Sequence, residues 1–125
     1  MPSHRANAYG TAVEYKMADE YGLELSRESW RDAVDGRGES HEIKAAMHEH
    51  ANGQPGNFKI YRQYHEKLQA QGGYYVFASY RIRGKGVQIL AHGRRHASRL
   101  PQVRWHGGGD HRDTQQAKIP ISAVL

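Results

Sequence analysis

Apolar residues recur every four positions near the start of the chain. Tyr9, Val13, Met17 and Tyr21 would share one side of a helix. The spacing predicts a helix from Ala6 to Tyr21, and Gly22 would end it.

Two short segments with alternating polar and apolar residues follow this helix. Residues 30–35 and 40–47 have the pattern of strands, and the Gly36-Arg37-Gly38 turn between them predicts a hairpin. Residues 48–57 are rich in Gly, Pro, Asn and His, which predicts a loop.

The rest of the chain predicts one more helix and one more hairpin. Residues 58–70 carry an apolar stripe of Ile60, Tyr64 and Leu68, so we expect a helix there. Residues 74–82 form the strongest strand pattern, and a Gly-Lys-Gly turn leads into a strand over 87–91. Residues 93–116 show no clear pattern, and 119–125 would be a closing strand or a tail.

The order of these elements predicts an α/β fold, in which a mixed sheet is flanked by helices. A chain of 125 residues has room for a single compact domain, and its 38% hydrophobic content predicts a modest core. It has no cysteine, which excludes disulfides and thiol nucleophiles. We find no membrane-spanning run and no signal-peptide pattern, so we expect a cytoplasmic protein.

The charge balance favours an anionic partner. The formal net charge is +5, and nine histidines would add charge near a polyanion. A basic domain of this kind is typical of nucleic-acid binding, although ordinary solubility charge explains it equally well. Arg94, Arg95 and Arg99 are candidate phosphate contacts, because they cluster in the sequence.

The first hairpin carries the sharpest chemical signal. Glu42 and Lys44 would point to the same face of a strand, and the preceding strand would bring Asp32 beside them. Two converging carboxylates repel unless a cation lies between them, and hard oxygen ligands suit Mg²⁺. Lys44 would position an attacking water and stabilise transition-state charge, so the group suits phosphodiester hydrolysis. The alternative is a surface salt bridge on an exposed hairpin.

This hairpin resembles the catalytic hairpin of the PvuII-like type II restriction endonucleases, within the PD-(D/E)xK nuclease superfamily. The ten-residue step from Asp32 to Glu42 matches, and the likeness continues in order over roughly residues 30–124. It rests on Asp32-Ala33-Val34-Asp35-Gly36, Glu42-Ile43-Lys44, Tyr61-Arg62-Gln63, Tyr75-Val76-Phe77-Ala78-Ser79-Tyr80-Arg81, Arg104-Trp105, Asp110-His111-Arg112-Asp113 and Lys118-Ile119-Pro120.

The resemblance implies a restriction-endonuclease-like fold and a catalytic role for the matching residues. Asp32 and Glu42 would be metal ligands for Mg²⁺, and Lys44 would be the catalytic lysine. Tyr61 matches a tyrosine near the metal site, with a buried helix aromatic as the alternative. Asp35 has the weaker match to the family.

The resemblance also implies which loops would read DNA. His48, His50 and Asn52 fall where the family has a His-rich base-reading segment. Gln115 and Gln116 replace an Asn pair that reaches into the major groove, and Gln can bind an adenine edge as Asn does. The alternative for each of these is a solvated loop residue.

The N-terminal segment departs most from the family. The resemblance divides the chain into a dimerisation segment (1–29), a catalytic core (30–82) and a DNA-recognition segment (83–125). Asn7 is a candidate minor-groove contact. Glu14 is a candidate accessory acid, with a solvent-facing helix residue as the alternative.

The expected function is a homodimeric, Mg²⁺-dependent type II restriction endonuclease that cuts double-stranded DNA at a short palindrome. The products would carry 5′-phosphate and 3′-hydroxyl ends, and a cognate DNA methyltransferase would belong to the same system. A junction-resolving or repair nuclease of the same superfamily and a non-catalytic DNA-binding module are the alternatives. Structural zinc is disfavoured, because the histidines lack the spacing of a zinc site.

Overall fold

The computed structural model describes residues 4–26, 31–108 and 111–125, and within these the side chains of 4–7, 108 and 111–114 lie outside the description. Its elements follow in chain order: α1 (His4–Tyr21), β1 (Glu24–Leu25), β2 (Ala33–Val34), β3 (Ser40–Met47), β4 (Asn57–Tyr61), α2 (Arg62–Ala70), β5 (Tyr74–Arg83), β6 (Gly86–His96), the 3-10 helix η1 (Ala97–Arg99), β7 (His106–Gly108), β8 (His111–Pro120) and α3 (Ile121–Val124).

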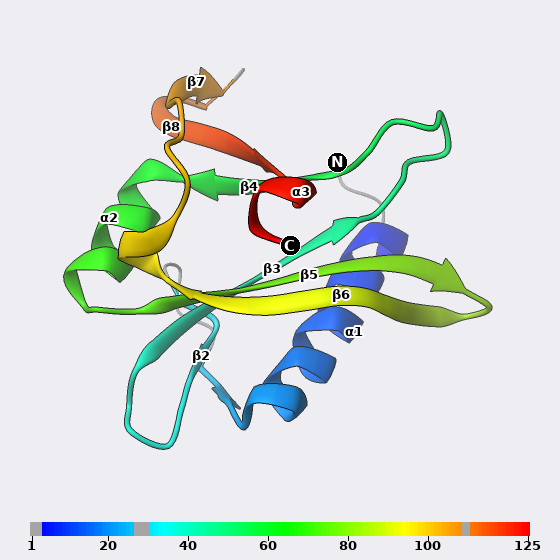
Figure 1. Cartoon of the computed structure of the whole chain (residues 1–125), viewed down its shortest axis with the longest axis horizontal. Helices are drawn as coiled ribbons and strands as arrows, with labels where there is room; N and C mark the ends of the chain where they lie inside the picture. The colour runs from blue at the N-terminus through cyan, green and yellow to red at the C-terminus, as the bar shows by residue number, and fades with distance from the viewer. Residues whose placement is uncertain (1–3, 27–30, 109–110) are drawn as a thin grey trace.

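Two sheets lie one above the other (Figure 1). The main sheet has the strand order β1-β2-β3-β5-β6, and the smaller sheet has the order β4-β8-β7. Strands β3 and β5 are parallel and the other pairs of the main sheet are antiparallel, so this sheet is mixed. The crossover from β3 to β5 passes through β4 and α2, which places both elements over one face of the main sheet.

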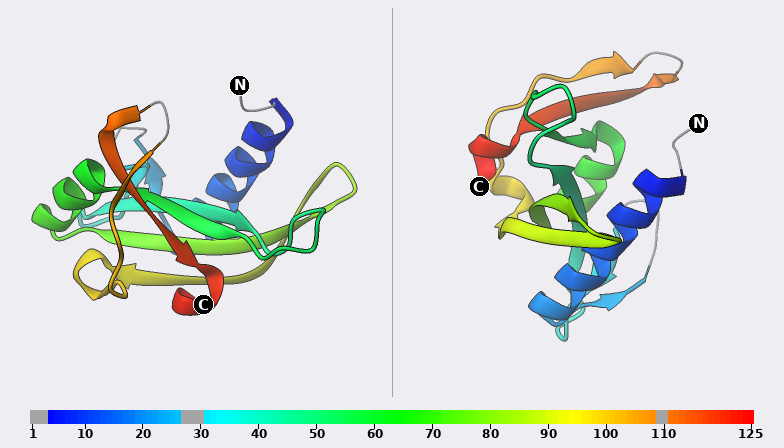
Figure 2. Two further views of the ribbon diagram at one scale, coloured as in Figure 1. Left: turned by 90° about the horizontal axis from the view of Figure 1, so that it is seen from above. Right: turned by 90° about the vertical axis from the view of Figure 1, so that its right-hand side faces the viewer.

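Each face of the main sheet buries its own set of side chains. Helix α1 covers one face, where Val13 and Met17 pack against Ile43, Val76 and Ala78. The smaller sheet, α2 and α3 cover the other face, and Figure 2 shows this second layer from two further sides. The core on that face contains Ala46, Phe58, Ile60, Leu68, Tyr75, Phe77, Ala97, Ala117, Ile119 and Val124.

The structure confirms the α/β fold, with a mixed sheet flanked by helices in one compact domain. It also confirms the first helix, the hairpin and the strand over 40–47. None of the helices in the described residues has the length and apolar content that a membrane span requires.

Residues 58–61 contradict the helix that we predicted from residue 58. They belong to β4, which pairs antiparallel with β8, and α2 begins only at Arg62. The buried Phe58 and Ile60 alternate with the exposed Asn57 and Lys59, which is the period of two of a strand. A short apolar run of this kind cannot be told from a helical stripe by sequence alone.

Other boundaries differ because distant pairing extends the strands. Strand β6 reaches residue 96 rather than 91, since β5 offers a partner along its whole length. The unassigned segment 93–116 contains β7 and the start of β8, and residues 121–124 form α3. Of the predicted strand over 30–35, only Ala33–Val34 pairs, and Trp30 lies outside the described residues.

Candidate active site

The β2–β3 hairpin holds Asp32 beside the middle of β3. The backbone N–H of Asp32 donates to the carbonyl of His41 at 2.8 Å. One oxygen of its carboxylate accepts a hydrogen bond from the N–H of Ile43, also at 2.8 Å. Because Ile43 lies between Glu42 and Lys44, this bond fixes the Asp32 carboxylate next to both.

The alternation of β3 separates the chemical face from the core face. Ile43 is 4% exposed and packs toward α1, whereas Glu42 and Lys44 point to the opposite face of the sheet. The Nζ atom of Lys44 lies 3.9 Å from Oε1 of Glu42, and both side chains are largely shielded from solvent. The hairpin therefore brings the three predicted residues together.

The Glu42 carboxyl is strongly perturbed. Burial raises the pKa of Glu42 to about 9, and the hydrogen bond with Asp32 adds to this rise. The positive charge of Lys44 lowers the pKa, and the negative charges of Asp32 and Glu14 raise it. Without a cation the Glu42 carboxyl therefore keeps a proton and hydrogen-bonds to Asp32.

This pair fits a hard divalent cation. In the described part of the chain no three residues among His, Asp and Glu gather as a ready-made metal cage. Mg²⁺ commonly uses only one or two carboxylates and takes its other ligands from water and substrate phosphate. Asp32 and Glu42 have the chemistry for such a site, because a cation would relieve their repulsion.

Aromatic side chains form the wall of the pocket around Glu42 and Lys44. The cavity has a volume of about 130 Å³, and its other lining residues are Ile60, Tyr61, Tyr64 and Tyr75. Tyr61 stands where β4 turns into α2, so the structure brings this predicted residue into the pocket. The rings of Tyr61 and Tyr64 meet edge to face, 6.0 Å apart.

Sequence reasoning missed Tyr64 and Tyr75. Tyr64 lies in the first turn of α2, and Tyr61 is the extended residue that precedes this helix. Tyr75 lies beside Glu42 in the parallel register of β3 and β5, a pairing that local sequence does not reveal. A hydrogen bond of 2.9 Å joins the Tyr75 hydroxyl to Nδ1 of His65. Burial and the nearby Glu42 raise the pKa of Tyr75, so the phenol stays protonated.

The two predicted base-reading segments lie at opposite ends of β4. His48, His50 and Asn52 are exposed in the loop that enters β4. Gln115 and Gln116 do not form a loop as predicted, because they belong to β8, where Gln116 pairs with Tyr61 and Gln115 accepts a hydrogen bond from Arg62. The two segments are therefore separated by the length of the five-residue strand β4.

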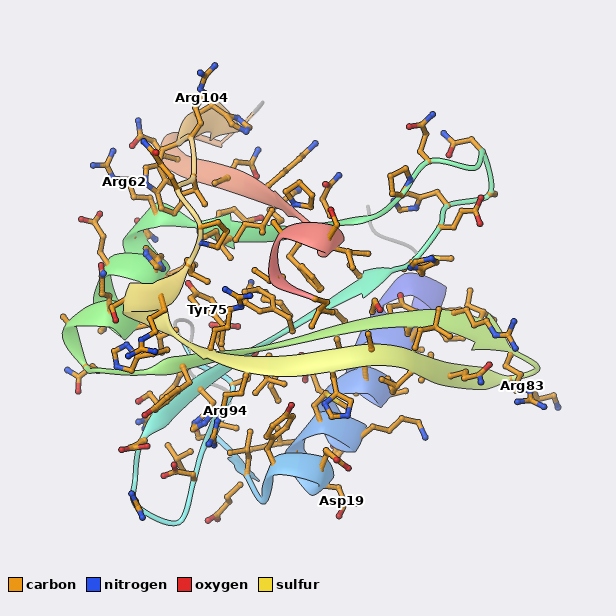
Figure 3. The ribbon with its side chains drawn as sticks, viewed as in Figure 1. Asp19, Arg62, Tyr75, Arg83, Arg94 and Arg104 are labelled. Atoms are coloured by element: carbon orange, nitrogen blue, oxygen red, sulfur yellow. The ribbon has the colours of Figure 1, made fainter. Side chains whose placement is uncertain are left out.

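The three predicted phosphate-binding arginines surround one open depression of about 690 Å³. They do not share a face of the sheet. Arg95 pairs with Tyr75 and shares its face, whereas Arg94 pairs with Val76 on the α1 face. Figure 3 shows Tyr75 and Arg94 on opposite sides of the main sheet. The Arg94 guanidinium lies 5.8 Å from the Tyr21 ring centre and 5.2 Å from that of Tyr74.

The remaining predicted site residues are Glu14, Asp35 and Asn7. Glu14 lies on α1 and its charge reaches Glu42, as the raised pKa of that residue records. Asp35 accepts hydrogen bonds from the N–H groups of Arg37 and Glu39 at 2.9 Å each, so it organises the hairpin turn. The side chain of Asn7 lies outside the described residues.

Comparison with family models matches residues 1–125 to the PD-(D/E)XK nuclease superfamily domain. Neither the curated proteins nor the solved structures gave a match. The chain belongs to the PD-(D/E)XK nuclease superfamily. Membership implies a nuclease that hydrolyses nucleic acid, with DNA as the suggested substrate, and such enzymes generally use divalent metals.

Proposed function

We propose that this chain is a type II restriction endonuclease that hydrolyses both strands of duplex DNA at a short palindrome. The observation that carries the proposal is the contact between Asp32 and Glu42 in a shielded pocket, with Lys44 3.9 Å from Glu42. A largely shielded Glu42 carboxyl held beside Asp32 is unfavourable for fold stability, and the pair becomes useful when a cation and a phosphate join it.

Asp32 and Glu42 would hold Mg²⁺ in this pocket. The metal would supply charge neutralisation at the phosphate and a bound water of lowered pKa. The protein residues do the remaining work. Lys44 orients the attacking water and stabilises negative charge that develops on the phosphate. The N–H of Ile43 keeps the Asp32 carboxylate in place, and the Tyr61 and Tyr64 rings limit access of bulk water.

The cleavage reaction breaks the bond between phosphorus and the 3′-oxygen. The oxygen of the attacking water joins phosphorus and its proton passes to the solvent, so the products carry a 5′-phosphate and a 3′-hydroxyl group. The leaving 3′-oxygen takes up a proton from solvent. Lys44 stays protonated in this scheme, because its role is to hold the water and the developing charge.

A symmetric homodimer would place one such pocket on each strand of a palindrome. Residues 1–29 are the proposed dimerisation segment, and Asn7 is the proposed minor-groove contact. The protein should sediment as a dimer, and a two-fold symmetric cleavage pattern should accompany it. A cognate DNA methyltransferase would protect the host site in this reading.

The test is cleavage of a long duplex in Mg²⁺, followed by sequencing of the fragment ends. The proposal expects fragments that share one short palindrome at their ends. Cleavage of four-way junctions in preference to duplex would favour a structure-specific nuclease of the superfamily. The polar side chains of His48 and Asn52 in the β3–β4 loop and of Gln116 in β8 favour base readout over that alternative. Sequence-independent binding with no cleavage would leave only a DNA-binding module.

A further inference from the structure

Two lysines face each other on the outer side of the smaller sheet. The register pairs Lys59 of β4 with Lys118 of β8, and both side chains are exposed. Directly opposed residues of an antiparallel pair point to the same face, with Cβ atoms about 5 Å apart. Like charges in this arrangement destabilise a sheet, so the pair needs an explanation.

The strand register fixes both lysine side chains on the outer face of the smaller sheet. Their neighbours Phe58, Ile60, Ala117 and Ile119 are at most 1% exposed, and they bury the inner face of the same two strands. A slip by one residue would exchange the faces, so burial of the four apolar side chains locks the lysines outward.

The positions next to the two lysines carry no acidic side chain. Strand β4 and residues 115–120 contain neither Asp nor Glu. In the described part of the chain neither lysine takes part in a recorded ion pair. The outer face therefore presents two adjacent positive charges to the solvent.

The strand that carries Lys59 ends at a residue of the catalytic pocket. Two positions beyond the lysine pair, Tyr61 of β4 pairs with Gln116 of β8. Gln116 also pairs with His106 of β7. Tyr61 lines the pocket that contains Glu42 and Lys44. Two residues of a strand span about 6.6 Å, which is about two nucleotide steps of rise along one DNA strand.

We propose that Lys59 and Lys118 form a phosphate clamp that holds the DNA backbone next to the cleaved bond, on the Tyr61 side. The inference rests on the proposed nuclease function and adds the residues that grip the substrate outside the pocket. Phosphates of one strand would neutralise the opposed lysines. Ammonium groups act here as point charges, so the grip is independent of base sequence.

The test measures affinity for a labelled duplex over a range of salt concentrations, in EDTA so that no cleavage occurs. Lys59→Gln and Lys118→Gln should each reduce the slope of log affinity against log salt by about 0.9, and the double variant by about 1.8. The loss should be equal for the cleaved sequence and for an unrelated duplex. Lys118→Arg should retain affinity, because the charge is kept.

Lys85→Gln is the matched control. Lys85 is an exposed lysine in the turn between β5 and β6, beside Arg83 and at the other end of the molecule from Arg62 (Figure 3). It loses the same charge, so it should leave the salt slope unchanged. Thermal unfolding of each variant shows that it folds, and removal of one opposed lysine should not lower the melting temperature.

Three outcomes would overturn the clamp. If Lys59→Gln and Lys118→Gln show the same salt slope as Lys85→Gln, the clamp is wrong. Mg²⁺-dependent cleavage by the wild type would still support the proposed function in that case. If poly-glutamate at equal charge competes for the protein as well as duplex DNA does, the partner of the Lys59 and Lys118 face would be an acidic protein. A wild-type protein that neither binds nor cuts any duplex would overturn both the clamp and the proposed function.

Discussion

Asp32, Glu42 and Lys44 are held in place by different forces. A backbone N–H holds the Asp32 carboxylate, and the pleat of β3 aims Glu42 and Lys44 away from α1. Burial then makes the ionised form of Glu42 costly, which is why its carboxyl keeps a proton beside Asp32.

Asp32→Ala, Glu42→Ala and Lys44→Ala should each abolish Mg²⁺-dependent cleavage of a duplex. Each removes a proposed metal ligand or the charge that stabilises the transition state. Circular dichroism should show an intact fold for all three. Asp35→Ala is the comparison, because the Asp35 side chain accepts its hydrogen bonds within the hairpin turn, and this variant should retain most activity. Near wild-type cleavage by Glu42→Ala would remove this pocket from consideration.

The stability of the metal-free protein should fall as the pH rises from about 5 to 9. Burial places the folded-state pKa of Glu42 at about 9, above its ordinary value of 4.5. Between these values the folded state holds more protons than the unfolded state, so the free energy of unfolding decreases with pH. Glu42→Gln cannot titrate. In EDTA it should therefore gain at least about 1 kcal/mol on the wild type between pH 5 and pH 9, since one pKa unit is about 1.4 kcal/mol.

Addition of Mg²⁺ supplies the control for this experiment. Saturating Mg²⁺ should raise the melting temperature of the wild type at pH 8, because a ligand that binds only the folded state stabilises it. Glu42→Gln should show little of this gain. Equal pH profiles for the two proteins in EDTA would contradict the buried, protonated state of Glu42.

At the scale of elements, the β3–β4 connection decides where Tyr61 stands. Strand β4 starts at Asn57, directly after Gly56, and ends at the residue that enters the pocket. Gly56 is buried, and its N–H donates to the carbonyl of His48 at 3.3 Å. The close approach of the two backbone segments thus sets the position of the whole strand.

Gly56→Ala should destabilise the fold by about 1–3 kcal/mol. A Cβ atom at this position would overlap the carbonyl oxygen of Met47, and backbone cannot move aside as a flexible side chain can. Gly86→Ala is the matched control, because a Cβ there meets nothing. Chemical denaturation measures both. Equal stabilities would show that the loop relaxes freely around Gly56.

Gln116→Ala should reduce cleavage at the recognised sequence far more than it reduces binding to unrelated duplex. Each good side-chain contact to a base edge discriminates by about 1–3 kcal/mol. Gln115→Ala is the informative neighbour, since the Gln115 side chain is already bonded to Arg62. Cleavage and binding are measured on the recognised site and on single-mismatch duplexes. No change in Gln116→Ala would mean that the proposed C-terminal match is out of register.

At the scale of the whole molecule, positive charge surrounds the edge strand β6. Arg94, Arg95 and Arg99 line one depression, but within the described part of the chain only Arg94 of the three rests on two tyrosine rings, which join α1 to the sheet. The Arg94 guanidinium therefore contributes to packing as well as to the charge of the depression. Replacing Arg94 should change both stability and binding, whereas replacing Arg95 or Arg99 should change binding.

Arg95→Gln and Arg99→Gln should weaken binding to every duplex about equally, and each should reduce the salt slope by about 0.9. Arg94→Gln should in addition lower the melting temperature, since cation–π contacts contribute about 0.5–1 kcal/mol at exposed sites. Anisotropy titrations and thermal unfolding measure the two effects. A salt-independent affinity of the wild type would argue against DNA as the partner.

Local pattern along the chain determined the fold class, the first helix and the hairpin with Asp32, Glu42 and Lys44. These features depend on periods of two and four residues and on a separation of ten positions, which short stretches of sequence display directly. The proximity of the three side chains followed from the same geometry, because a hairpin brings neighbouring segments together. Tyr61 entered through the resemblance to a family, and the structure places it in the same pocket.

Only the tertiary structure decided the features that depend on distant partners. Strand β4 exists because β8, more than fifty positions away, pairs with it, whereas its short apolar run fits a helix equally well on local grounds. The same pairing opposes Lys59 to Lys118, and the parallel register of β3 and β5 brings Tyr75 beside Glu42. The high pKa of Glu42 also needs the assembled core, because desolvation arises from every layer that covers the carboxyl.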